Sequence, residues 1–400
     1  MSSRRSTSAL AAVAAGATVF GAQGLSPALP AVQKALSISD SEVGLVTAAY
    51  MLPGVLLAIP LGYLADRYGR RVIFSSTALL FGIAGAAEAF APSFHVLLGL
   101  RVVQGVGFAA LMPLSMTLIA DAYSGSVEQV HAQASRQISL TGGELVFPIV
   151  GATLAGISWR APFAAQGLLV PIAIVGFLIL DDSRSDLGPK GAYRSELGVA
   201  MRQPGMKAVL LAGFLRFWCK FALIAYLPTI LVQRHGASLT QAALVLSVAA
   251  GVATAINLGV VRMLKQIQAS LLLTAAVLGV GLSLVLFAFT PTWQIGVVVA
   301  IGFGISDGTL QVLQNAFVAI AAPERVRGGL IAVSGMTRNS GKLIAPLVVG
   351  GLILVVSPPV AFAAIGISTW LLVPALRPLR QLDRLLRPHD AELPTIPEAV

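Results

Sequence analysis

The sequence predicts an all-α polytopic membrane protein with twelve transmembrane helices in two pseudo-symmetric six-helix bundles. Apolar residues make up 56% of its 400 residues and charged residues only 11%, whereas about a quarter of an ordinary soluble domain is charged. The mean hydropathy of +0.85 is spread along the whole chain. Apolar stretches also recur between charged breaks, in two sets of six. This composition excludes a disordered, collagenous or ordinary cytosolic protein.

Each apolar stretch has the length that a membrane-spanning helix requires. A hydrocarbon core of ~30 Å needs about 20 residues, because each helical residue rises ~1.5 Å. The spans predicted in the first half cover residues 8–30, 43–65, 72–91, 94–120, 136–157 and 161–180. The spans predicted in the second half cover residues 208–232, 239–262, 268–289, 292–321, 329–356 and 358–376.

A long polar stretch containing glycine and proline separates the two sets of spans, which is typical of a linker. The predicted parts are an N-terminal bundle (1–180), a cytoplasmic linker (181–207), a C-terminal bundle (208–376) and a cytoplasmic tail (377–400). Two matched sets of spans indicate internal duplication, as expected when a transporter is built from two bundles around a central site.

The distribution of basic residues predicts the orientation. The net charge of +10 arises from 27 basic and 17 acidic residues, and in a soluble protein this excess would suggest nucleic acid as a partner. Here most basic residues fall on alternate ends of the spans, beside both termini and the linker. We therefore expect a multi-pass protein of the cell membrane with both termini in the cytoplasm. The basic excess then reflects anionic headgroups, and no nucleic acid is expected.

A single thiol, Cys219, cannot form an internal disulfide or a clustered thiolate metal site. No metal and no cofactor are expected. The expected partners are the lipid bilayer, protons and a small-molecule substrate, and the protein is expected to be a monomer.

The turn after the second predicted span carries a dense charge cluster, GYLADRYGRR. Its distinctive positions are Gly62, Asp66, Arg67, Gly69, Arg70 and Arg71. Gly62 would permit close helix packing, Gly69 a tight turn, and Asp66 a pair with an arginine or a helix N-terminus. A topology loop would explain the arginines but not the aspartate and both glycines. The cluster resembles the signature of the major facilitator superfamily, Gly-x-x-x-Asp-Arg-x-Gly-Arg-Arg, at every position. The resemblance implies a latch between the bundles on the cytoplasmic side, stabilising the outward-open state.

The fourth predicted span looks like a second motif of that family, Arg-x-x-Gln-Gly-x-Gly-x-x-Ala. The matching residues are Arg101, Gln104, Gly105, Gly107 and Ala110. The resemblance implies a role in proton coupling for Arg101, and the alternative is an arginine tied structurally to backbone carbonyls. A charge near mid-bilayer costs ~2.5 to 3.5 kcal/mol on insertion scales, so either role requires a partner or a wet cavity.

The fifth predicted span partly resembles the family's antiporter motif, Gly-x-x-x-Gly-Pro-x-x-Gly-Gly. Gly143, Pro148 and Gly151 match, whereas Phe147 and Ala152 replace glycines. We expect a proline-bent, closely packed helix, and the partial match favours export over uptake.

Ionisable residues inside spans are candidates for function. Arg216 and Lys220 are spaced i and i+4, as are Arg338 and Lys342, so each pair projects from one face of its helix. Like charges placed this way repel unless an anion lies between or opposite them, which favours an organic anion as substrate. The alternative for Lys220 is a place near a helix end, with its ammonium group extending to the interface.

Glu144 and Asp307, one in each half, are the candidate proton sites, because carboxyl groups shielded from water can change protonation near neutral pH. The alternative is that they are salt-bridge partners of the basic pairs. Glu144 shares a polar stripe with Thr141, and Asp307 shares one with Gln311 and Gln314, so both stripes are expected to face the substrate path. The remaining candidates for this path are Gln23, Tyr50 and Gln104.

These patterns predict a secondary transporter, proton-coupled and working by alternating access on a small organic solute. The partial antiporter motif favours efflux of amphipathic compounds. The basic pairs and an acid-free first helix favour an organic anion, and an uptake symporter for such a metabolite is the alternative. A membrane solute sensor would need a cytoplasmic output domain, and an intramembrane enzyme would need a clustered nucleophile, base or metal set. The sequence indicates neither.

Overall fold

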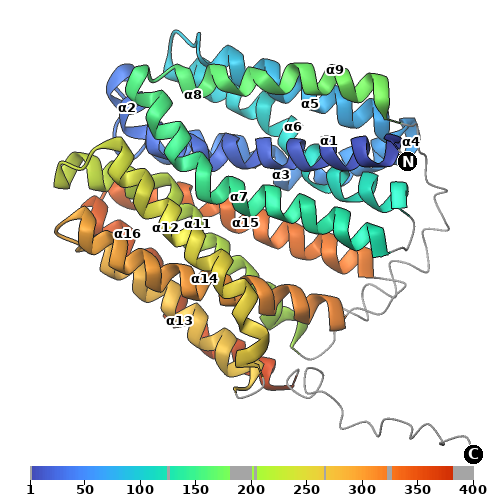
Figure 1. Cartoon of the computed structure of the whole chain (residues 1–400). Coiled ribbons are helices and arrows are strands. Elements are labelled where there is room, and N and C mark those ends of the chain that lie inside the picture. Colours follow the sequence, from blue (N-terminus) through green and yellow to red (C-terminus); the bar gives the residue numbers. More distant parts are fainter. Residues whose placement is uncertain are drawn as a thin grey trace, which may run out of the picture.

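The computed structural model describes residues 2–123, 127–180, 201, 205–264, 267–321 and 327–381, and within these residues every element is a helix (Figure 1). The first half contains α1 (Ser2–Val19), η1 (Phe20–Gly24), η2 (Ser26–Ala28), α2 (Leu29–Leu36), α3 (Val43–Leu56), α4 (Ala58–Tyr68), α5 (Arg70–Glu88), α6 (Phe94–Tyr123), α7 (Val127–Ile157), α8 (Ala161–Ala164), η3 (Ala165–Leu168) and α9 (Leu169–Ile179). The second half contains α11 (Met206–His235), α12 (Leu239–Met263), α13 (Ala269–Ala288), α14 (Trp293–Ala321), α15 (Arg327–Ile353), α16 (Pro358–Leu372) and η5 (Val373–Gln381). Most of the predicted linker (181–207) and most of the predicted tail (377–400) lie outside the described residues.

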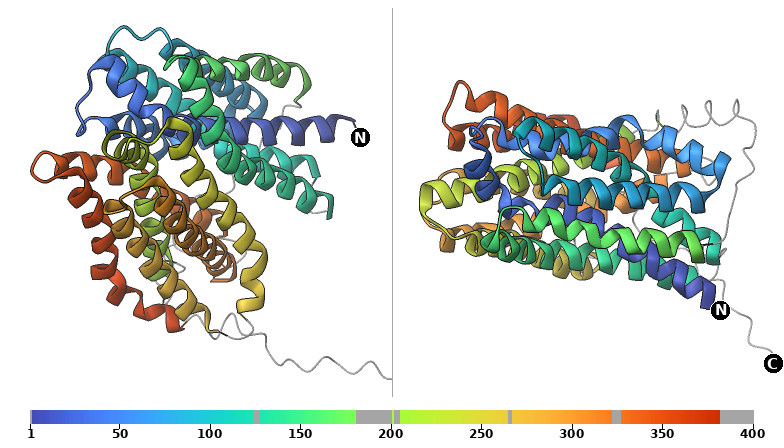
Figure 2. Two further views of the ribbon diagram at one scale, coloured as in Figure 1. Left: turned by 60° about the vertical axis from the view of Figure 1, so that its left-hand side comes forward. Right: turned by 90° about the horizontal axis from the view of Figure 1, so that it is seen from above.

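The helices form two bundles that lie side by side (Figures 1 and 2). In the first bundle α6 packs on α1, α3 and α5, and in the second α14 packs on α12 and α13 while α11 packs on α15. Between the bundles α3 meets α15 and α7 meets α12. The second span of one half therefore meets the fifth span of the other in both directions, as a two-fold pseudo-symmetry requires. The predicted fold class of two pseudo-symmetric helical bundles is confirmed.

The number of spans is less regular than the sequence predicts. Ten helices in the described parts of the chain are long and apolar enough to cross a membrane, and the bent pair α3 and α4 makes eleven. Helix α15 is not among them, because Arg338, Asn339 and Lys342 make its middle polar. Length and hydropathy alone therefore do not establish the predicted count of twelve.

The first span is interrupted, whereas the sequence predicts one continuous helix over 8–30. A span of 33 residues, Arg4–Leu36, contains the π-helical turn η1 and the 3-10 turn η2. Pro27 has no amide hydrogen to donate to the carbonyl one turn earlier, and Pro30 follows three residues later, so regular α-helical bonding stops here. The interruption lies at mid-span, where a transporter would place its site.

The second span is bent by 56° between Val43–Leu56 and Pro60–Tyr68. Pro60 cannot donate a hydrogen bond to Leu56, and its ring crowds that carbonyl, so the helix restarts in a new direction. The predicted span 43–65 is therefore two helices, α3 and α4. The bend directs the charged turn at Asp66 and Arg70 toward α6.

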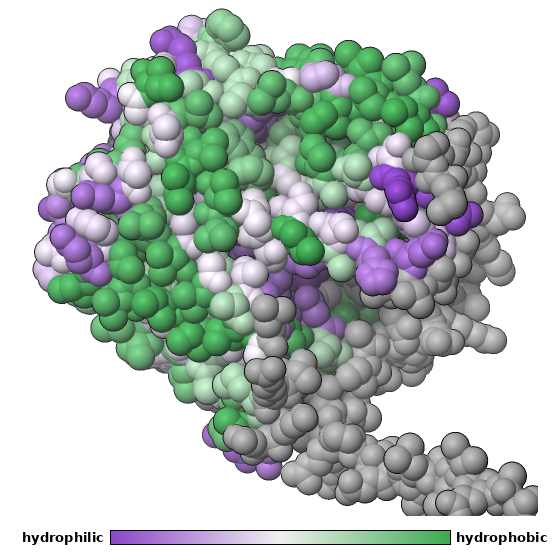
Figure 3. Space-filling view, viewed as in Figure 1, coloured by the Kyte–Doolittle hydropathy of each residue, from purple (hydrophilic) through white to green (hydrophobic). Residues whose placement is uncertain are grey.

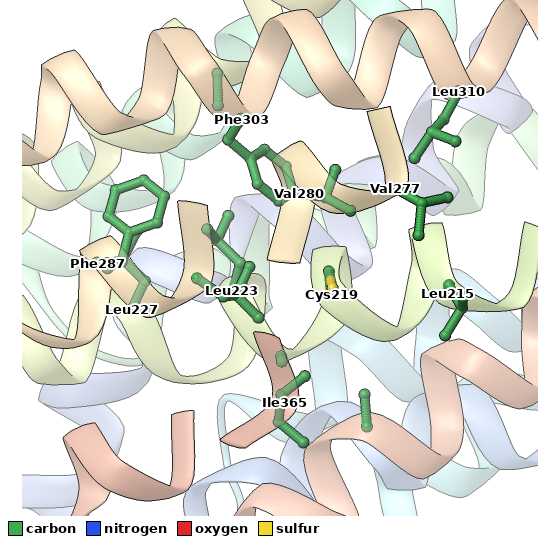
Figure 4. Packing of buried hydrophobic residues seen from close by; sticks show 14 of the residues in the cluster. Leu215, Cys219, Leu223, Leu227, Val277, Val280, Phe287, Phe303, Leu310 and Ile365 are labelled. Carbon is green, nitrogen blue, oxygen red and sulfur yellow. The ribbon is translucent and has the colours of Figure 1, made fainter. Parts of the chain in front are cut away.

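Helix α11 is the centre of the second bundle. Leu215, Cys219, Leu223 and Leu227 recur every fourth residue and face the interior of their own bundle. They pack among side chains of α13, α14 and α16 (Figure 4), which include Val277, Val280, Phe287, Phe303, Leu310 and Ile365. Because this face is closed by apolar packing, Arg216 and Lys220 are directed to another side of α11.

The face of the molecule seen in Figure 3 is mainly apolar. Large apolar side chains that are exposed include Ile83, Leu178, Leu282 and Leu371. Polar residues gather at the ends of the molecule and in a strip between the bundles (Figure 3). An apolar belt around a polar centre is the arrangement expected of helices whose solvent is lipid.

Candidate functional site

A buried ion cluster lies on the helices that meet between the two bundles. The Arg216 guanidinium of α11 donates from Nε to Asp307 Oδ1 of α14 at 2.6 Å and from Nη2 to Oδ2 at 3.1 Å. One turn along α11, Lys220 Nζ donates to the same Oδ2 at 3.1 Å. A single carboxylate thus holds both cations of the i, i+4 pair, and the planar fork of the arginine fixes its orientation.

Lys220 also links the second bundle to the first. Its Nζ donates to Glu144 Oε2 of α7 at 3.0 Å. The Lys220 side chain is 7% exposed, whereas that of Glu144 is 24% exposed. Lys220 lies near the middle of α11 and is buried, so a place at a helix end is wrong for it. Glu144 and Asp307 have the alternative geometry considered for them, as ion-pair partners of Arg216 and Lys220.

The polar stripe on α14 divides between two environments. Gln311 Oε1 accepts a hydrogen bond from Arg216 Nη2 at 3.0 Å and so belongs to the ion cluster. Gln314 is instead buried against Gly213 of α11, with Nε2 3.5 Å from Ser334 Oγ of α15. Gly213 has no side chain, and Gln314 fills the space left beside it. The predicted place of Gln314 on the substrate path stays a prediction.

The stripe on α7 becomes more buried toward its C-terminal half. Thr141 is half-buried and its hydroxyl donates to the Gln137 carbonyl at 3.0 Å. Glu144 is half-buried, whereas Pro148 and Gly151 are buried. The accessible part of the stripe thus ends at the level of Glu144.

The second basic pair has a different environment from the first. Arg338 and Lys342 of α15 are both half-buried. Arg338 Nη1 donates to Asn315 Oδ1 at 3.3 Å. Lys342 Nζ lies over three aromatic rings, 4.8 Å from the centroid of Phe217, 5.5 Å from that of Phe108 and 5.6 Å from that of Phe221. The predicted organisation into two i, i+4 pairs holds, but only Arg216 and Lys220 are paired with carboxylates by these contacts.

Arg101 is the centre of a polar network inside the first bundle. Its Nη1 donates to Gln104 Oε1 at 2.7 Å and its Nη2 to the Gly21 carbonyl at 3.0 Å. Glu88 Oε2 of α5 lies 3.7 Å from Nη1 and is fully buried. The backbone tie expected as the alternative is thus present together with a carboxylate partner.

Glu88 is one of three acids that the sequence places inside spans, which makes it a candidate for function, but it was not among the predicted proton sites. The missing information was its distance to Arg101, because the two residues lie on different helices and their spacing along the chain indicates no contact. Gln166, the acceptor for Gln104 Nε2, was missed for the same reason.

Three residues expected on the substrate path are buried in this conformation. Tyr50 is 0% exposed, donates to the Thr18 carbonyl at 2.9 Å and lies under the Arg101 guanidinium. Gln104 is 0% exposed and accepts a hydrogen bond from Arg101. Gln23 is 8% exposed and lies on the π-helical turn. The helices of the first bundle close around Arg101 and leave Tyr50 and Gln104 inside, and a place on the substrate path stays a prediction for both.

The charged loop after the second span makes contacts within the first bundle. Arg70 pairs with Asp66 at 3.2 Å and also with Asp121 near the end of α6, and Arg71 donates to the Phe177 carbonyl of α9. Gly69 has a φ of 101°, which glycine adopts at no steric cost, and it forms the predicted tight turn between α4 and α5. The Arg67 guanidinium is exposed and lies over the Tyr68 ring at 5.4 Å.

Three of the glycines expected at helix contacts do lie at close approaches. A Cβ at Gly105 would collide with the Tyr50 carbonyl, one at Gly107 with Phe81, and one at Gly151 with the Gly24 carbonyl of the interrupted first span. The expectation is wrong at Gly62, because among the described residues no atom of another helix lies within 4 Å of a Cβ built there. It is also wrong at Gly143, where the nearest side chain is Phe147 of the same helix. Helix α7 passes through Pro148 as one element.

The bundles are joined tightly at the end that carries the loop between α2 and α3. Tyr226 of α11 places its hydroxyl 3.2 Å from the Gly44 amide, 3.2 Å from the Pro346 carbonyl and 3.4 Å from the Ser41 carbonyl. Gln233 donates to Gln33 at 2.7 Å. We call this set of contacts the sealed end. The N-terminus lies at the opposite end of the molecule (Figure 1).

Two pseudo-symmetric helical bundles, an apolar belt and charged residues buried between the bundles define a polytopic membrane transporter. The chain belongs to the Major Facilitator Superfamily, whose family model matches residues 11–346. The resemblance carried by the charged loop and by the Arg101 motif is thereby confirmed at the level of the family.

Among known proteins, the chain is similar to the bacillibactin exporter of Bacillus subtilis (strain 168), with 35% identity over 145 residues that cover 35% of this chain and 36% of the relative. It is also similar to the multidrug efflux pump LfrA of Mycolicibacterium smegmatis, with 32% identity over 159 residues that cover 39% of this chain and 32% of the relative. The matched segments thus span only about a third of each of these relatives.

A solved bacterial homologue of the human lysosomal transporter Spinster, in an inward-facing and unoccupied conformation, has the same fold. The TM-score is 0.75 at 17% identity, and the match covers 96% of this chain and 97% of that chain. At this identity the likeness concerns the fold alone.

Proposed function

We propose that this protein is a proton-coupled exporter of a small organic solute that works by alternating access in the cell membrane, with both termini in the cytoplasm. The observation that carries the proposal is the ion pair between Glu144 and Lys220, because it joins a carboxylate of the first bundle to a cation of the second. The exporters among its relatives support the direction. The basic residues beside the termini support the orientation.

Protonation of Glu144 would remove the negative charge that holds Lys220 across the boundary between the bundles. Lys220 would keep a partner, because Asp307 remains at 3.1 Å and is itself held by Arg216. The bundles could then separate at this point without leaving an unpaired cation in the membrane interior, where its cost would oppose the movement. In this scheme Glu144 is the proton carrier, Asp307 the fixed charge and Arg101, with Glu88, a second candidate for proton linkage.

The test is proton movement in proteoliposomes that contain the full chain and an internal pH-sensitive dye. We would add 2-naphthoate or the cationic dye ethidium outside and record the internal pH. Antiport predicts that the internal pH rises as substrate enters, because protons leave in exchange. Uptake by symport, the alternative for an organic anion, predicts that it falls.

Glu144→Gln is expected to abolish substrate-dependent proton movement and to keep substrate binding, since the amide oxygen still accepts a hydrogen bond from Lys220. The matched control is Glu128→Gln, which removes an exposed carboxyl from the first turn of the same helix and should leave transport unchanged. Unchanged proton movement in Glu144→Gln would refute its assignment as proton carrier. Substrate binding without flux in the unaltered protein would favour a sensor over a transporter.

A further inference from the structure

Lys342 lies where two spans of the second bundle face a span of the first. It stands on α15, and the rings around its ammonium group come from Phe217 and Phe221 of α11 and from Phe108 of α6. Asn339 lies three residues before Lys342 on α15, and its Nδ2 donates to the Gly54 carbonyl of α3 at 3.1 Å. This face of α15 is therefore turned toward the first bundle, near the middle of the span.

The charges around Lys342 do not balance. Arg338 of α15 and Arg216 and Lys220 of α11 are cations near it, and Glu144 is a nearby carboxylate. Asp307 and Glu144 are both used by the first basic pair. In the parts of the chain that the structure describes, no carboxylate lies within 4.0 Å of Arg338 or Lys342, so neither positive charge is in contact with an opposite charge.

The aromatic rings stabilise the Lys342 cation but do not neutralise it. A cation is attracted to an aromatic face, and Lys342 Nζ lies over three of them. The ring faces carry partial charge but no net charge, so the surplus on Arg338 and Lys342 remains. Among the residues that the structure describes, Arg338 donates one hydrogen bond, to the neutral oxygen of Asn315, and its other donors suit a carboxylate.

We infer that Arg338 and Lys342 form the substrate's anion subsite and that the transported class is an amphipathic organic anion with an aromatic group. Its carboxylate or phenolate would lie between the two cations, whose Cβ atoms are about 5 to 6 Å apart at i, i+4 spacing. Its ring would stack beside Phe217 and Phe108. This assignment rests on the proposed transport function and adds the substrate class to it.

The test compares two probes of similar size, the anion 2-naphthoate and the neutral 2-naphthamide. Their equilibrium binding to the full chain is measured in lipid nanodiscs without a pH gradient. We expect 2-naphthoate to bind at least about tenfold more tightly than the amide, since each factor of ten is a 1.4 kcal/mol difference. Lys342→Gln is expected to reduce the affinity for 2-naphthoate about tenfold and to leave that for 2-naphthamide unchanged. The control is Lys207→Gln, an exposed lysine near the start of α11, which should change neither.

Arg338→Gln provides a second measurement if Lys342→Gln does not fold, and it is expected to lower the preference for 2-naphthoate in the same direction. Equal affinity of the two probes for the unaltered protein would overturn the inference. A preference for 2-naphthoate that survives both substitutions would also overturn it. Charge-selective binding together with an absence of proton movement would support this subsite and contradict the proposed coupling, so the two failures are distinguishable.

Discussion

At the scale of single residues, Asp307 organises the centre of the molecule. It is 2% exposed and accepts hydrogen bonds from both Arg216 and Lys220. Burying one unpaired charge is expensive, but the cost falls when every charged group has a partner with good geometry. The arrangement therefore depends on all three side chains together, and removing any one of them changes the environment of the others.

Asp307→Asn should destabilise the protein by about 3 to 5 kcal/mol, the usual cost of breaking a buried ion pair by removing one partner. Arg216→Gln should cost a similar amount because it leaves the opposite imbalance. The double variant should lose less than the sum of the two, since it removes a negative and a positive charge together. Thermal unfolding in detergent measures all three, with Glu128→Gln as a control that should unfold like the unaltered protein. Additive losses would contradict the cluster as a single unit.

At the scale of elements, Tyr226 connects the ends of two helices from different bundles. The amide of Gly44 belongs to the first turn of α3, where amides have no acceptor within their own helix. The Tyr226 hydroxyl on α11 supplies that acceptor. The same hydroxyl lies at hydrogen-bonding distance from the Pro346 carbonyl of α15, so a single side chain joins α3, α11 and α15. Gly44 and Gly350 allow this approach, because a Cβ at either would collide with the hydroxyl or a nearby carbonyl.

Tyr226→Phe removes the acceptor for Gly44 and should weaken the sealed end by about 1 to 3 kcal/mol, the cost of an unsatisfied buried donor. Because these contacts join the two bundles, losing one should destabilise the conformation that is closed at the sealed end. The share of molecules that are open at this end should then rise. Ser39 is exposed in the adjoining loop. Two fluorophores, one attached at Ser39 and one at Arg234, would report the change by resonance energy transfer. Unchanged separation between the labels would show that the hydroxyl does not hold this end closed. Tyr63→Phe, on an exposed tyrosine of α4, is the matched control.

At the scale of the whole molecule, the described residues join the two bundles at more than one level along the helices. Tyr226, Gln33 and Gln233 join the bundles at the sealed end, and the ion pair of Glu144 and Lys220 joins them near mid-span. In the charged loop, Arg70 pairs with Asp66 and Asp121 of its own bundle. Alternating access requires the sealed end to separate while the other end closes.

Gln33→Cys combined with Gln233→Cys tests this requirement. The two amide groups are 2.7 Å apart, so a short bismethanethiosulfonate reagent should join the introduced thiols and stop transport, and a reducing agent should restore it. The native Cys219 is 0% exposed and should not react. Each single variant is a control that should continue to transport. Transport at the full rate by cross-linked protein would mean that the sealed end does not open during the cycle.

Much of the fold follows from the sequence because lipid imposes simple rules. Helices need about 20 apolar residues, and basic residues gather on one side, so spans and bundles could be predicted from local composition. The interruption at Pro27 and the bend at Pro60 could not be placed in space, since a proline breaks hydrogen bonding without specifying the new direction. Arg338 and Lys342 were predicted as a pair, but the rings of Phe108 and Phe217 came from elements distant in the chain.

The site was predicted in composition but not in pairing. Glu144 and Asp307 were identified as buried carboxyl groups, and their shared partner Lys220 depends on how α7, α11 and α14 meet. Glu88 shows the same limit, because its contact with Arg101 crosses from α5 to α6. Spacing along one helix predicts which side chains share a face, whereas contacts between helices depend on the packing of the whole bundle.

Because α6 is longer than the hydrocarbon core is thick, the ion pair near its end and the buried ion cluster lie in different surroundings. Its 30 residues extend over ~45 Å, about 15 Å more than a hydrocarbon core, and Asp121 lies two residues from its end. We therefore expect the contact between Asp121 and Arg70 to fall among headgroups and water, where dissolved ions weaken an exposed ion pair. The pair of Arg216 and Asp307 is shielded from those ions. Ionic strength thus acts on the rim of the transporter and leaves its centre unchanged, so the medium can alter the charged loop without altering the ion cluster.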